Sequence, residues 1–171
     1  MLFGVRYDAN AALNGHYVIV TSWSGMAAAE AEFAERVRRL FDIRKHKTLA
    51  TLRRDGSPRI SGIEAEFADG ELWLGMMPGS VKAADLRRDQ RLALHSPTQD
   101  PPEDDPSAWP GEAKIAGRAI EVTDAEPSGE PSHRFKVDVT EVVLTRVGVP
   151  ADHLVIESWH EGRGLTRRER Q

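Results

Sequence analysis

The chain has 171 residues, of which 40% are hydrophobic and 29% are charged, and its formal net charge is −4 at pH 7. This composition is typical of one globular domain with or without an appendage. The negative charge gives no basic field that would favour a nucleic acid partner. No apolar run reaches the ~18 residues that a membrane span needs. The chain lacks cysteine, which excludes disulfides and cysteine-ligated metals, so we expect a cytoplasmic protein.

The N-terminal residues 1–25 contain only a short apolar stretch, 17–20, and lack the long apolar region of a signal peptide. This stretch is either a strand of the domain or part of an upstream extension. Met26 is a plausible alternative start. We therefore expect residues 1–25 to form an extension that packs on the outside, and residues 26–171 to form the domain.

A helix is predicted at residues 26–41. Phe33, Val37, Leu40 and Phe41 recur at the spacing of one helical face, which gives an apolar stripe suited to packing on a sheet.

Most of the remaining chain reads as strands. Alternating apolar residues, with Asp-Gly turns at 55–56 and 69–70, indicate an antiparallel meander followed by further strands. A proline-rich, acidic loop is expected at 97–111, a short helix at 80–88, and a basic, polar tail at 161–171. This pattern predicts a mainly β protein, a barrel with few helices. The predicted strands are 47–53, 59–67, 71–76, 91–96, 113–123, 135–147 and 153–160.

The start of the 80–88 helix carries an unusual charge. Ser80 is placed to cap the helix or to donate its hydroxyl to an anion, and Lys82 lies in the first turn. A cation there is disfavoured by the helix dipole by a few tenths of a kcal/mol. A bound phosphate would reverse this, because both the free N–H groups and the lysine attract it. The alternative is a lysine simply exposed to water, and physics alone leaves the two even.

At these residues the chain resembles the pyridoxamine-phosphate-oxidase-like, flavin-binding split-barrel family. The similarity lies in Gly79, Ser80 and Lys82 followed by "LRRDQR", in the hairpin "TLATLRRDGSPRIS" with Arg59 opening its second strand, and in "VIESWHEGRG" with Trp159. It covers roughly residues 35–160. The order and spacing of these segments carry the resemblance, since no single motif is decisive.

The resemblance implies an antiparallel split β-barrel of six or seven strands, forming a homodimer with a cofactor at its interface. It implies hydride transfer to or from a small molecule, with FMN as cofactor and a deazaflavin coenzyme or, less favoured, haem as alternatives. Phosphate contacts would come from the serine, the lysine and the arginine, and the ring system would lie along strand residues 60–63. The tryptophan would come from the partner chain. The implied cofactor-binding residues are Arg59, Ile60, Ser61, Gly62, Met76, Ser80, Lys82 and Trp159.

Three departures from the family pattern leave a second reading open. Val81 stands where the oxidases have an arginine, Glu64 or Ala65 stands near the position of a substrate-binding lysine, and the late Arg-Leu-His signature is absent. These differences speak against vitamin B6 oxidation. The alternative is a non-catalytic carrier of flavin, deazaflavin or haem, or a degenerate split barrel. We assign no catalytic residue and no metal ligand.

Overall fold

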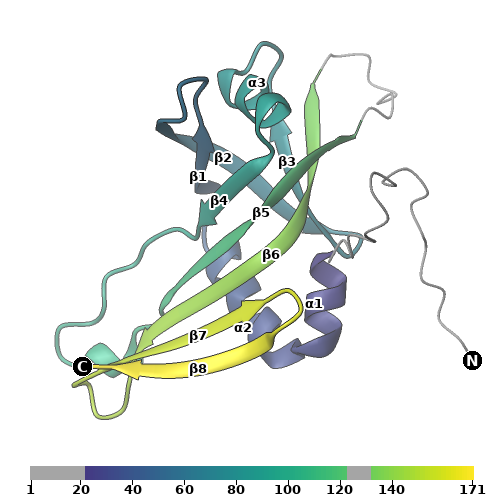
Figure 1. The fold of residues 1–171 in the computed structure, drawn as a ribbon. Helices are drawn as coiled ribbons and strands as arrows, with labels where there is room; N and C mark the ends of the chain where they lie inside the picture. The colour runs from purple at the N-terminus through teal and green to yellow at the C-terminus, as the bar shows by residue number, and fades with distance from the viewer. Residues whose placement is uncertain (1–21, 123–131) are drawn as a thin grey trace, which may run out of the picture.

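The computed structural model describes residues 22–122 and 132–171. The predicted mainly β fold is confirmed: eight antiparallel strands and three α-helices form the described part of the chain (Figure 1). The elements are α1 Trp23–Ala29, α2 Ala31–Asp42, β1 His46–Leu52, β2 Pro58–Ala68, β3 Glu71–Met76, α3 Val81–Arg88, β4 Arg91–His95, the 3-10 turn η1 Pro106–Ala108, β5 Glu112–Val122, β6 His133–Val147, β7 Leu154–His160 and β8 Gly164–Arg170. No helix among these residues is long and apolar enough to cross a membrane.

Six strands close into a barrel. Their order is β3-β2-β1-β4-β5-β6, and a further pairing between β3 and β6 completes the circle. The two predicted Asp-Gly turns connect β1 to β2 and β2 to β3, with Gly56 and Gly70 both at positive φ. Alternating burial along β1 and β4 directs every second side chain into the barrel. Outward-facing residues of adjacent strands are therefore brought into register on the surface.

The remaining two strands extend the sheet beyond the barrel, where β7 pairs with β6 and β8 pairs with β7 (Figure 1). The strand β8 was not predicted, so the described part of the chain has one strand more than the six or seven expected. Its sequence, "GLTRRER", offers no apolar alternation because this edge strand has a mostly exposed surface. Backbone pairing with β7, from Leu165 opposite Trp159 to Arg170 opposite Leu154, makes it a strand.

The predicted single helix 26–41 is wrong in one respect, since two helices occupy this region. The backbone of Glu30, with φ −134° and ψ 61°, leaves the helical range and separates α1 from α2. Alanine-rich sequence around this point favours a continuous helix locally. The break lets both helices place an apolar side on the sheet, with Trp23 and Met26 from α1 and Phe33 from α2 buried.

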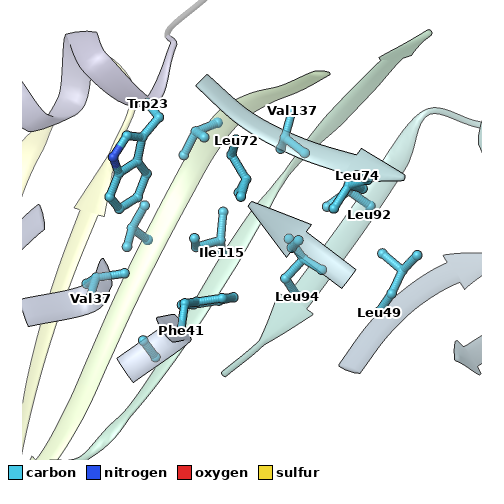
Figure 2. Packing of buried hydrophobic residues seen from close by; sticks show 14 of the residues in the cluster. Trp23, Val37, Phe41, Leu49, Leu72, Leu74, Leu92, Leu94, Ile115 and Val137 are labelled. Atoms are coloured by element: carbon cyan, nitrogen blue, oxygen red, sulfur yellow. The ribbon is translucent and has the colours of Figure 1, made fainter. Parts of the chain in front are cut away.

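The core joins the barrel interior to the layer of α1 and α2. Trp23 of α1 and Val37 and Phe41 of α2 lie beside inward-facing strand residues such as Leu72 and Ile115 (Figure 2). The predicted apolar stripe of the helix is thus buried. Residues 1–21 of the predicted extension lie outside the described part of the chain, as does most of the segment 124–133. Within the predicted extension, Trp23 is a core residue.

Candidate functional site

The outer face of the barrel presents a track of mostly small side chains across four strands. Ala50 of β1 lies opposite Ile60 of β2 on one side and opposite Ala93 of β4 on the other. Ala93 in turn lies opposite Ala116 of β5. Because methyl groups project little from a sheet, a flat molecule could lie close to the backbone here. The track is open at β2, where a Cβ added to Gly62 would meet nothing within 4 Å.

Lys82 connects this face to the start of α3. Its Nζ donates a 2.9 Å hydrogen bond to the carbonyl oxygen of Gly62, twenty residues earlier in the chain. No carboxylate among the described residues pairs with Lys82, so its charge is not neutralised by the protein. The structure therefore brings together two of the predicted site segments, the beginning of α3 and the middle of β2.

The start of α3 is shaped by the turn before it. Gly79 adopts φ +71°, a conformation that favours glycine, and Ser80 follows as the residue preceding the first helical turn. The Ser80 side chain makes no capping hydrogen bond to the helix. Its hydroxyl is thus available to another acceptor or donor, beside the unpaired N–H groups that begin every helix.

Arg59 has a different environment from the one predicted. Its Nε donates a 2.6 Å hydrogen bond to Oδ2 of Asp85, whose side chain is only 4% exposed. Asp85 also accepts hydrogen bonds from Thr51 Oγ1 at 3.0 Å and from Arg88 Nη2 at 2.8 Å. Burial alone would raise the pKa of Asp85, but the hydrogen bonds from Arg88, Arg59 and Thr51 outweigh it and hold the pKa below its usual value.

Sequence reasoning missed Asp85, which ties α3 to both strands of the first hairpin. A signal was present, since an acid three residues before Arg88 is suited to an ion pair on one helical face. What the sequence could not show is that the same carboxylate also receives Arg59 from β2. The arginine predicted to hold a phosphate is thereby committed, at its Nε, to the protein itself.

Three of the predicted cofactor-binding residues do not lie on this outer surface. Ser61 is opposite Leu49 and is half-buried on the side of β2 that faces inward. Met76 and Trp159 are 5% and 6% exposed and belong to the hydrophobic core. Trp159 would have to leave that core to reach a molecule bound to a partner chain. The predicted cofactor contacts of these three residues stay predictions.

Large apolar side chains are exposed around the same region. Ile60 of β2, Met77 after β3 and Val81 at the beginning of α3 are 75%, 80% and 58% exposed. All three belong to segments that adjoin the contact between Lys82 and Gly62. Apolar side chains with this exposure, on segments that adjoin an unneutralised cation, are typical of a surface that binds a ligand or a partner.

Comparison with known proteins finds relatives by structure only. No family model matches the sequence, and no curated protein matches it. A crystal structure of PhzG from Burkholderia lata, in complex with tetrahydrophenazine-1-carboxylic acid, is similar with a TM-score of 0.60 and 11% identity, covering 82% of this chain and 91% of that one.

Two further structures show the same likeness. A pyridoxamine 5'-phosphate oxidase-related, FMN-binding protein from Nostoc punctiforme has a TM-score of 0.59 and 10% identity, over 86% of this chain and 99% of that one. A protein of Clostridium acetobutylicum related to general stress protein 26, of the pyridoxinephosphate oxidase family, has a TM-score of 0.54 and 12% identity, over 68% and 90%. At these identities the likeness concerns the fold.

Proposed function

We propose that this chain is an oxidoreductase that binds a flavin-type cofactor between the start of α3 and the outer face of β2. The chain has the split β-barrel fold of pyridoxamine 5'-phosphate oxidase-related proteins. The observation that carries this proposal is the hydrogen bond from Lys82 Nζ to the Gly62 carbonyl oxygen. It places an unneutralised cation beside a strand surface that is open to a flat ligand.

The phosphate of the cofactor fits the start of α3. Lys82 supplies a full charge without a carboxylate partner, and the Ser80 hydroxyl is not used in capping. Helix N–H groups add a partial positive charge at the same point. A phosphate here would explain why the chain places a lysine where the helix dipole disfavours one. The carbonyl of Gly62 would then hold Lys82 in position, so that little side-chain entropy is lost on binding.

The ring system fits the track of small residues beside Gly62. Ile60 offers an apolar contact, while Ala50 and Ala93 leave the sheet surface flat. When bound, a flavin supplies the hydride chemistry that side chains lack. The residues of this chain would bind the cofactor, orient it and exclude water from one face. We assign none of them a proton-transfer role.

We also propose a homodimer, with a small molecule as the second reactant. Ile60, Met77 and Val81 expose apolar surface next to the proposed cofactor, and a second copy of the chain would cover both. Such an arrangement would shield the cofactor from water on the side that the first chain leaves open.

FMN is the cofactor we propose, with a deazaflavin coenzyme as the first alternative and haem as the second. The pairing of Arg59 with Asp85 favours one further candidate, a split barrel that carries a cofactor without turning over a substrate or that binds none. In that case Arg59 would make no contact with the phosphate, and position 81 is a valine.

The absorbance spectrum of the purified protein tests these alternatives. A flavin spectrum, or a saturable quenching of FMN fluorescence on titration, supports the proposal. A deazaflavin spectrum would identify a deazaflavin coenzyme as the cofactor, and a Soret band would identify haem. A colourless protein that binds none of the three cofactors at micromolar concentration would contradict the proposed function.

A further inference from the structure

A hollow lies at the other end of α3, where the helix gives way to β4. It has a volume of about 400 Å³ and is lined by Arg87, Arg88, Asp89, Gln90, Arg91 and Arg118. Four arginines and one aspartate line it, and Glu121 and Asp85 pair with Arg87 and Arg88, so this group of side chains keeps a formal charge of +1 in a chain whose net charge is −4. The C-terminus of α3 contributes about half a negative charge, which leaves a small positive excess.

Two of these arginines are paired with carboxylates. Arg87 donates from Nε and Nη2 to Glu121, at 2.7 and 2.6 Å, and Arg91 donates from the same two nitrogens to Asp89, at 2.9 and 2.6 Å. Within the described part of the chain, neither uses its Nη1. A guanidinium has five N–H donors, so each keeps donors for a ligand while it is paired with its carboxylate.

Arg118 is the uncommitted member of the group. It makes no hydrogen bond or ion pair with the described residues, and it lies directly opposite Arg91 in the β4–β5 pairing. Like charges facing each other across two strands are unfavourable. On its other side Arg118 lies opposite Asp138 of β6, which offsets part of this repulsion. The other nearby carboxylates are already paired, Asp85 with Arg88 and Arg59, and Asp89 with Arg91. An external anion between the two strands would remove this repulsion.

We propose that this hollow binds the phosphate group of a small molecule, at a site separate from the one that includes Lys82. Arginine suits this role because its planar donors match two phosphate oxygens at once. The two sites lie at opposite ends of α3, whose eight residues span about 12 Å at the helical rise of 1.5 Å per residue. One phosphate cannot occupy both, so the second site goes beyond the proposed cofactor.

The test is a calorimetric titration with inorganic pyrophosphate of the unaltered protein and of three variants. Arg118→Ala removes the unpaired cation from an exposed position and should weaken binding about tenfold or more. Arg168→Ala removes an equally exposed strand arginine from β8 and should leave binding unchanged. Lys82→Ala should also leave the pyrophosphate signal at the hollow intact, since it alters only the other end of α3.

Circular dichroism confirms that each variant is folded. Three results would each contradict the second site. Pyrophosphate could fail to bind, all variants could bind it with equal affinity, or the binding signal could be lost only in Lys82→Ala. The last result would still support the phosphate site at the start of α3. A parallel titration with a single-stranded oligonucleotide addresses nucleic acid. If it bound more tightly than pyrophosphate and depended on Arg118, the proposal of a small-molecule site would be wrong.

Discussion

Arg59 of β2 and Asp85 of α3 are joined by a 2.6 Å hydrogen bond that fixes the helix against the first hairpin of the barrel. Asp85 lies one helical turn after Lys82, on the same short helix. The carboxylate thereby determines where the proposed phosphate ligand is held relative to β2.

Asp85→Asn should destabilise the protein by about 2–3 kcal/mol. Breaking a buried ion pair usually costs about 3–5 kcal/mol. The expected loss is no larger than the lower of these values because Arg59 and Arg88 are partly exposed and stay hydrated when the carboxylate is lost. Urea unfolding of both proteins measures the difference. Asp89→Asn is the matched control, since it breaks an exposed pair with Arg91 on the same segment and should cost much less. Equal losses in the two variants would show that Asp85 has no special structural role.

The same carboxylate predicts how stability depends on pH. The folded-state pKa of Asp85 is depressed, so its contribution is fully present above the ordinary aspartate pKa of about 3.9 and is lost as the pH falls through the lower, folded value. Glu157, whose pKa is lowered by its hydrogen bond from Arg36, adds a loss in the same direction. Unfolding free energies measured from pH 7 to 3 should therefore fall at the acid end.

In Asp85→Asn the unfolding free energy should fall less steeply at acid pH, because one of the carboxylates with a lowered pKa is gone. A variant whose stability changes with pH as steeply as that of the unaltered protein would contradict the assignment.

Lys82→Ala should weaken cofactor binding. Loss of a charge-assisted phosphate contact costs about 1.5–3 kcal/mol, which is on the order of a 10- to 100-fold rise in Kd. Fluorescence titration with FMN measures it, and Lys45→Ala, which removes the same charge from an exposed lysine paired with Glu64, is the control. An unchanged Kd in Lys82→Ala would remove the phosphate site from the start of α3.

Ile60→Glu should convert the proposed dimer into monomers, because it places a charge in the apolar surface that a second copy would cover. Size-exclusion chromatography with light scattering should give twice the 19.0 kDa chain mass for the unaltered protein and the single mass for the variant. Val149→Glu alters an equally exposed apolar residue in the β6–β7 connection and should stay dimeric. Monomers in all three samples would rule out the dimer, and dimers in all three would place its interface elsewhere.

The sequence by itself determined the barrel strands, because alternation and Asp-Gly turns are local signals, and β1, β2 and β3 begin and end close to where these signals predict. It also identified Lys82 as a cation in an unfavourable position. Tertiary structure alone decided that Lys82 reaches Gly62, that Asp85 holds Arg59, and that Trp159 is buried. It likewise made β8 a strand and interrupted the first helix at Glu30. The contacts of Lys82 and Asp85 and the burial of Trp159 depend on groups far apart in the chain, whose meeting is set by the tertiary fold and not by local propensity.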